Sequence, residues 1–214
     1  MIFRPIRQSV LFLLLMLSVA LLIVACQTSS IKQSPTVSDS ISGTNNCRIV
    51  EHSLGETEVC GQPQKVVALS PRILDSILAL GVQPAGFAQS VNSKIKIYDD
   101  PSAQIPYLGQ WVTTQPIGLG DRKSPSLERL AQLQPDLILG EEWNNKDEYS
   151  LLTQIAPTLL FSDTKNPNEI QSWQQDIQGI AKALGKQAQA AELLATFNKQ
   201  ILQARTALQP VLQK

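Results

Sequence analysis

The sequence predicts an α/β fold built around a parallel sheet, and three observations point to this class. Two short apolar runs, Val66–Leu69 and Leu137–Leu139, have the length and composition of fully buried strands. One Ser-Pro pair, Ser70-Pro71, follows the first run, and another, Ser124-Pro125, precedes the second. In each pair Ser suits the N-cap of a helix and Pro suits its first turn. Strand, capped helix and strand, in this order, are typical of a parallel α/β sheet.

Both predicted helices carry one apolar face. Its residues recur at helical spacing, at Leu74, Ile77 and Leu78 in the first helix and at Leu127, Leu130 and Leu133 in the second. Gly81 is expected to end the first helix, and the second is expected to span Ser124–Gln134, before Pro135.

Further elements continue the α/β order. The sequence predicts strands at Pro84–Ala88, Ile105–Leu108 and Thr158–Phe161, a short helix at Asp147–Ile155, and longer helices at Glu169–Leu184 and Lys186–Leu208. The polar run Gln89–Gln104 is expected on the surface. Trp173 falls on the apolar face of its helix and is interpreted as a core residue.

Polar residues directly after the buried strands define the expected ligand edge. Parallel sheets bind ligands at the carboxyl ends of their strands. In this chain those ends carry Ser70, Arg72, Glu141 and Trp143.

Composition limits the possible functions. The 214 residues allow one large domain or two small ones, and 43% hydrophobic with 17% charged residues is typical of a globular protein. Eighteen basic and eighteen acidic residues give zero net charge, which argues against general nucleic-acid binding. His52 is the only histidine, so a metal site made from several histidines of one chain is excluded.

The amino end reads as a targeting segment, Met1–Ala25, with a basic start and an apolar run at Val10–Val24. One interpretation is a transmembrane anchor, although the run is short for a span of about 20 residues. The other is a bacterial lipoprotein signal, because Ile23-Val24-Ala25-Cys26 resembles the lipobox. That resemblance implies cleavage before Cys26 and a lipid on its thiol. Gln27–Asn46 is rich in Ser, Thr and Asn and lacks periodicity, so it reads as a flexible tether.

The segment Cys47–Cys60, CRIVEHSLGETEVC, predicts a β-hairpin with strands at Arg48–Glu51 and Thr57–Val59 and a turn near Ser53–Gly55. If Glu51 pairs with Glu56, the register places Cys47 opposite Cys60, and in an exported protein we expect a disulfide. Two unpaired thiols, or a metal site that includes His52, are the alternatives. His52 itself is interpreted as a turn residue.

From about Arg48 to Leu208 the chain resembles the amino-terminal lobe and linking helix of a periplasmic binding protein. The family serves ABC importers of ferric siderophores, haem and vitamin B12. The likeness rests on KVVALSPRILDSILALGVQPAGFA, GDRKSPSLERLAQLQPDLILG, LLTQIAPTLLF and IAKALGKQAQAAELLATF in this order. The lipobox and the hairpin resemble the siderophore branch. The implied organisation is a signal peptide over residues 1–25, a tether over 26–46, a Rossmann-like lobe over 47–168 and a helical segment over 169–214.

The resemblance implies a lipid-anchored, substrate-binding component of an ABC importer that captures an iron(III)–siderophore complex at the periplasmic face of the cell envelope. It implies no resident cofactor. The family has two lobes, and nothing after Lys214 supplies the second. A truncated reading frame, a fragment or a second chain would each account for this. The alternative function is a non-transporting remnant that binds little or no ligand.

An enzyme is the third hypothesis, and the sequence disfavours it. The chain contains no Gly-x-Ser-x-Gly elbow, phosphate loop or Gly-x-Gly-x-x-Gly fingerprint. With His52 in a turn outside the core, histidine-based acid–base chemistry lacks its usual residue.

By resemblance, ligand contacts come from the loops above the strands, and the candidates are Arg122, Trp143, Ser70, Arg72 and Trp111. A guanidinium at Arg122 suits carboxylate, catecholate or hydroxamate oxygens. Trp143 follows a buried strand, where it offers a flat wall for a chelate or packs against a second lobe. Ser70 is alternatively a helix cap, and both arginines are alternatively solvated. Trp111, in an irregular loop, is the weakest candidate.

Glu128 is predicted to dock the importer. It lies in Ser126-Leu127-Glu128-Arg129-Leu130, which matches a family pattern in which a glutamate on the lobe pairs with arginines of the membrane subunit. The alternative is local, because an acidic residue in a first helical turn is favoured by about 0.3–1 kcal/mol.

Overall fold

A computed structural model describes residues 46–89, 94–162 and 172–212. The predicted signal peptide, Cys26 and nearly all of the predicted tether lie outside these residues. Among the helices of the described residues, none combines the length and apolar character needed to cross a bilayer.

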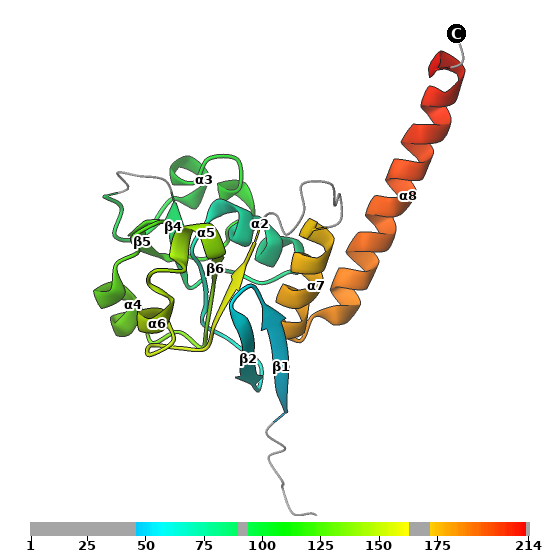
Figure 1. Cartoon of the computed structure of the whole chain (residues 1–214). Helices are drawn as coiled ribbons and strands as arrows, with labels where there is room; N and C mark the ends of the chain where they lie inside the picture. The colour runs from blue at the N-terminus through cyan, green and yellow to red at the C-terminus, as the bar shows by residue number, and fades with distance from the viewer. Residues whose placement is uncertain (1–45, 90–93, 163–171, 213–214) are drawn as a thin grey trace, which may run out of the picture. The chain divides into compact units, whose positions relative to one another are not determined.

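Five parallel strands form the predicted sheet, in the order β5-β4-β3-β6-β7. The strands are β3 (Val66–Ala68), β4 (Gly86–Gln89), β5 (Ile117–Asp121), β6 (Leu137–Glu141) and β7 (Thr158–Phe161). The helices are α2 (Pro71–Ala79), α3 (Pro101–Gln104), α4 (Leu127–Leu133), α5 (Glu142–Asn145), α6 (Tyr149–Leu152), α7 (Ser172–Leu184) and α8 (Gln187–Leu212), with the 3₁₀ turn η1 at Gly109–Trp111. Figure 1 shows their arrangement.

The core lies on both faces of the sheet, which explains why its strands are continuously apolar. Val66 and Ala68 belong to one buried cluster, together with apolar residues of α2 and α7. Val67 and Leu69 belong to the other, with Leu130 of α4. Successive side chains of a strand point to opposite faces, so a strand covered on both sides needs apolar residues at every position.

The predicted hairpin is confirmed, as β1 (Cys47–His52) and β2 (Gly55–Cys60). Cys47 pairs with Cys60 and Glu51 with Glu56, in the register expected from the sequence. The two cysteines form a disulfide with an S–S distance of 2.01 Å. Their sulfurs are therefore not free thiols, and neither alternative interpretation of the pair holds.

Ser70 and Gly81 bound the first helix as predicted. The Ser70 hydroxyl accepts a hydrogen bond from the Ile73 amide at 3.2 Å, and Pro71 is the first helical residue. Gly81 follows the helix with φ +73°, a conformation that favours glycine.

The N-cap predicted for the second helix, Ser124, is wrong by two residues. α4 begins at Leu127, and Ser126 is its N-cap, with its hydroxyl accepting from the Arg129 amide at 3.4 Å. Pro125 instead pairs with Gly120 in an isolated β-bridge, so the Ser124-Pro125 pair belongs to the loop that leads into the helix.

The strand expected at Ile105–Leu108 is also wrong, because Pro106 lacks an N–H and Tyr107 adopts φ +65°, which ends any extended run. The third strand of the sheet is instead β5, Ile117–Asp121. It was not predicted because it contains two glycines, which are unusual in a strand. Gly118 is needed there: a Cβ at this position would lie 2.1 Å from the Ile95 carbonyl oxygen.

Two further predictions require adjustment. The surface run Gln89–Gln104 contains Tyr98, which is fully buried against Phe87, with ring centroids 5.5 Å apart. The short helix expected at Asp147–Ile155 is confined to Tyr149–Leu152, and α5 precedes it.

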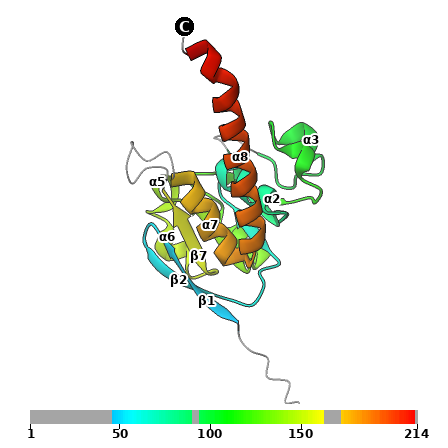
Figure 2. The ribbon, with the colours of Figure 1, turned by 90° about the vertical axis from the view of Figure 1, so that its right-hand side faces the viewer.

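The two carboxyl-terminal helices follow the prediction closely. α7 ends at Leu184 as expected, although the first residues of its predicted range lie outside the described ones. Trp173 is partly buried and packs edge-on against Phe197 of α8, with centroids 4.8 Å apart. The side chains of α8 are all exposed from Asn198 to Gln209, and Figures 1 and 2 show this half of the helix running clear of the sheet.

Candidate ligand-binding site

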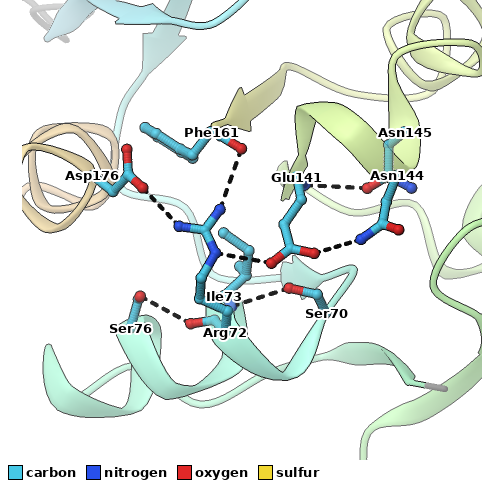
Figure 3. Close-up of polar contacts among 9 residues, drawn as sticks. All are labelled: Ser70, Arg72, Ile73, Ser76, Glu141, Asn144, Asn145, Phe161 and Asp176. Atoms are coloured by element: carbon cyan, nitrogen blue, oxygen red, sulfur yellow. Dashed lines mark hydrogen bonds and ion pairs between the residues drawn. The ribbon is translucent and has the colours of Figure 1, made fainter. Parts of the chain in front are cut away.

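The expected ligand edge carries a polar network centred on Arg72 (Figure 3). Its Nε donates to Glu141 Oε1 at 2.8 Å and its Nη1 to Asp176 Oδ2 at 2.6 Å. Its Nη2 donates to the Phe161 carbonyl oxygen at 3.2 Å. The guanidinium thus joins α2 to β6, β7 and α7. This sequence-predicted site residue has its nitrogens engaged within the chain.

Glu141 and the two asparagines after it are the buried part of this edge. Glu141 is 3% exposed, Asn144 7% and Asn145 0%. The second carboxylate oxygen of Glu141 accepts from Asn144 Nδ2 at 2.5 Å. A buried carboxylate requires such partners, because desolvation of an unpaired charge is costly. The edge is therefore a built polar structure.

Arg122 and Trp143 come together at this edge. The guanidinium carbon of Arg122 lies 5.2 Å from the centroid of the Trp143 ring, and Lys123 Nζ lies 5.6 Å from it. These distances suit cation–π attraction. Trp143 is 51% exposed. An aromatic face flanked by two cations can stack on a flat ligand and pair with its anionic oxygens.

Lys123 was not predicted from the sequence, since an exposed lysine in a loop resembles any solvated charge. Asn145 was likewise missed. Its Nδ2 donates to the Arg122 carbonyl oxygen at 2.7 Å, which links the loop after β5 to the turn after β6.

The other sequence candidates lie apart from this pair. Ser70 is fully buried, and its hydroxyl caps α2. Trp111 is 55% exposed on η1 and makes no ring contact with Arg122 or Trp143 among the described residues. Glu128 is exposed in the first turn of α4 and accepts from Gln132 Nε2 at 3.2 Å, which leaves its carboxylate at the surface.

Two grooves of the described residues adjoin the Arg72 network, since Asp176 lines both and Arg72 lines the first. A groove of about 350 Å³ lies between α2, α7 and α8 and includes Trp173 and Phe197 in its lining. A second, of about 680 Å³, lies between the hairpin and α7. Trp143 lines neither of these grooves, and its side chain is 51% exposed.

The described residues provide no metal centre of the usual kind. Their one cluster of three metal-ligating residue types is Cys47, Glu58 and Cys60, and its two sulfurs are joined in the disulfide.

The described residues thus form a parallel α/β lobe with an exposed aromatic ring and two cations at the carboxyl edge of its sheet, followed by a long helix. The family model described as "Periplasmic binding protein" matches residues 66–214. The chain belongs to this family, which is one of binding proteins and not of enzymes.

The chain is similar in sequence to binding proteins of several bacteria. It is 28% identical to the putative ABC transporter substrate-binding lipoprotein YhfQ of Bacillus subtilis, over 92% of this chain and 56% of that protein. It is 30% identical to the Fe(3+)-citrate-binding protein YfmC of the same organism, over 87% and 54%. The crystal structure of Staphylococcus aureus SirA complexed with staphyloferrin B superposes with a TM-score of 0.58 at 29% identity, covering 72% of this chain and 48% of SirA. The chain thus spans about half the length of these relatives.

Proposed function

We propose that this chain binds an iron(III)–siderophore chelate as the substrate-binding component of an ABC importer. The observation that carries the proposal is the pairing of Arg122 and Lys123 with the exposed ring of Trp143 at the carboxyl edge of the sheet. Ferric siderophores present planar or anionic oxygen donors, which suit a guanidinium, an ammonium and an aromatic face. Relatives named for binding ferric citrate and a probable siderophore-binding lipoprotein, YfiY, support the same ligand class.

In this proposal Arg122 and Trp143 contact the ligand directly. Ser70 and Arg72 do not contact the ligand in this proposal and stabilise the edge of the sheet instead. Ser70 caps α2, and Arg72 forms an ion pair with Glu141. Trp111 is a peripheral contact at most, given its place on η1. Glu128, exposed in the first turn of α4, is proposed to dock the membrane subunit of the importer.

Anchoring at the cell envelope belongs to the same proposal. Residues 1–25 would direct export, and Cys26 would carry a lipid that holds the chain at a membrane, facing the periplasm. The lipobox-like Ile23-Val24-Ala25-Cys26 and the relatives named as lipoproteins support this assignment.

A tryptophan fluorescence titration of the 214-residue chain tests the proposal. Ferric citrate, ferric petrobactin and ferric enterobactin are the probes, and saturable quenching by one of them is expected. In Arg122→Ala the dissociation constant of that probe should rise tenfold or more, because a hydrogen bond to a charged group contributes about 1.5–3 kcal/mol.

Arg205→Ala is the matched control, since it removes an exposed guanidinium from α8 and should leave the affinity unchanged. No response to any probe from a folded protein would instead favour the alternative, a lobe that folds but binds no chelate.

A further inference from the structure

The turn that carries Trp143 also holds a completely buried amide. Asn145 is the last residue of the four-residue helix α5, and its side chain is 0% exposed. Sequence reasoning gave it no role. A buried asparagine must satisfy a donor and an acceptor at once, or its burial is costly.

Both ends of this amide bind backbone groups of the ligand edge. Asn145 Oδ1 accepts from the Glu141 amide at 3.2 Å, and Nδ2 donates to the Arg122 carbonyl oxygen at 2.7 Å. A backbone N–H can only donate and a carbonyl can only accept, so these partners permit a single orientation of the amide. The side chain bridges the end of β6 and the loop that follows β5.

Gly140 makes room for this bridge. A Cβ at residue 140 would lie 2.7 Å from Asn145 Oδ1 and 2.9 Å from Leu160 Cδ2. Either distance is too short for a carbon atom, and the second neighbour belongs to the packed core. The glycine at the end of β6 therefore permits the amide to reach the Glu141 backbone.

Hydrogen bonds hold the backbone of Arg122 at both its N–H and its carbonyl group, and Asn145 makes the second of them. The Arg122 N–H donates to the Gln89 carbonyl oxygen at 2.8 Å, which ties the residue to β4. Its carbonyl is bound by Asn145, two residues after Trp143 in sequence. With both backbone groups held, the Arg122 side chain leaves the loop where its guanidinium reaches the Trp143 ring at 5.2 Å.

We propose that Asn145 is a positioning residue of the ligand site, which sets the Arg122 guanidinium over the Trp143 ring. It does so by joining the loop that carries Arg122 to the end of β6, from which α5 with Trp143 begins. The proposal rests on the proposed function only for its consequence, a higher ligand affinity. The positioning itself is a property of the ligand-free protein. Asn145 touches no ligand in this account and acts through Arg122.

A double-variant cycle read by fluorescence tests the positioning. Trp111→Phe and Trp173→Phe leave Trp143 as the single tryptophan of the three in the chain. A cation over an indole ring interacts with its π-system. Lys123→Ala, added to the same background, removes the second cation 5.6 Å from the ring, so the ligand-free emission of Trp143 then reports the Arg122 contact. Asn145→Ala should shift this emission in the same direction as Arg122→Ala, and should add nothing when Arg122 is already alanine.

A merely structural Asn145 would behave differently. An equal emission shift in the presence and absence of the Arg122 side chain, or no shift at all, would overturn the proposal. Thr158→Val is the matched control, because it removes another fully buried hydrogen bond, from Thr158 Oγ1 to the Ala156 carbonyl at 2.9 Å, at the opposite end of the sheet strands. It should lower stability without changing Trp143 emission.

Should Asn145→Ala not fold, Asn145→Asp serves in the same cycle, since it keeps the size and the acceptor but replaces the donor to Arg122. Ferric citrate titrations of the same variants then separate the two claims. Asn145→Ala should weaken binding by the same factor as Arg122→Ala, with no further loss in the double variant. If no variant, the parent included, binds a chelate, the proposed function fails while the emission cycle still decides the positioning.

Discussion

At the scale of single residues, Arg72 joins α2 to three other elements of the lobe through Glu141, Asp176 and Phe161. Its guanidinium pairs with Glu141 at 2.8 Å and with Asp176 at 2.6 Å, and its side chain is 25% exposed. Because Glu141 is nearly completely buried, its carboxylate relies on this cation and on the Asn144 amide for solvation.

Replacing Arg72 should therefore be costly. Arg72→Ala is expected to lower the free energy of unfolding by about 2–4 kcal/mol, below the full effect of a broken buried pair because the arginine is partly exposed. Denaturant unfolding measures this loss, and Arg205→Ala on α8 serves as the exposed control. Equal stability of the two variants would show that the Arg72 network contributes nothing to stability.

The interpretation of His52 as a turn residue is wrong, because His52 is the last residue of β1 and pairs with Gly55. Its Nε2 lies 3.0 Å from Thr57 Oγ1 and 3.3 Å from the Tyr149 hydroxyl. Its Nδ1 accepts from the amides of Leu54 at 3.3 Å and Leu160 at 3.4 Å. An accepting Nδ1 must be unprotonated, and burial lowers the pKa of His52 below its ordinary value.

This lowered pKa gives a pH dependence of defined sign. The unfolded chain takes up the proton near pH 6.5, the ordinary value, while the folded chain resists it to lower pH. The His52 contribution to stability is therefore complete above about pH 6.5 and decreases as the pH falls through that value. Because His52 is the only histidine, its NMR titration is unambiguous. A measured pKa at or above 6.5, or an unchanged pH dependence of unfolding in His52→Gln, would contradict this account.

At the scale of single elements, the two serines before α4, which flank Pro125, have different roles. Ser126 caps the helix, and Ser124 lies in the loop before it. Ser126→Ala should cost about 0.5–2 kcal/mol of stability, the usual effect of losing an N-cap. Ser124→Ala should stay within about 0.5 kcal/mol of the parent. Thermal or denaturant unfolding of the two variants shows which serine caps α4. A larger loss of stability in Ser124→Ala than in Ser126→Ala would contradict the assignment of Ser126 as the cap.

Elements with a strong local signal could be predicted from the sequence. The Thr158–Phe161 strand, the hairpin register and the Ser70 cap each follow from apolar runs or from residue types with one favoured position. The β5 strand could not be predicted, because glycine is unusual in a strand and no local pattern accounts for the two in this one. Gly118 is needed for the close approach of the distant Ile95 backbone, and Gly120 adopts φ +83°.

The candidate site was predicted unevenly for the same reason. Trp143 stood out because a tryptophan after a buried strand lacks a core role. Lys123 and Asn145 carry no such mark: one resembles a solvated charge and the other a turn residue. Only the packing of β5 beside β4, and of α5 over the end of β6, brings them to the Arg122 loop.

At the scale of the whole molecule, the described residues form an α/β lobe with the exposed Trp143 ring at the carboxyl edge of its sheet. Ligand pockets usually bury most of the ligand surface, whereas the Trp143 ring beside Arg122 is 51% exposed. The chain spans about half the length of the relatives it matches, at 56% of YhfQ and 54% of YfmC. A ferric chelate held on the Arg122–Trp143 surface alone is therefore expected to bind more weakly than one enclosed in a pocket.

The measurement that tests the central claim most directly is the position of the iron. The chain would be crystallised with the ferric chelate that quenches its fluorescence, or with ferric citrate if none does, and an anomalous difference map recorded at the iron absorption edge. The account predicts one iron peak at the carboxyl edge of the sheet, beside Trp143 and the Arg122 guanidinium. A peak against another element, such as the groove between the hairpin and α7, or no peak at saturating chelate, would contradict it.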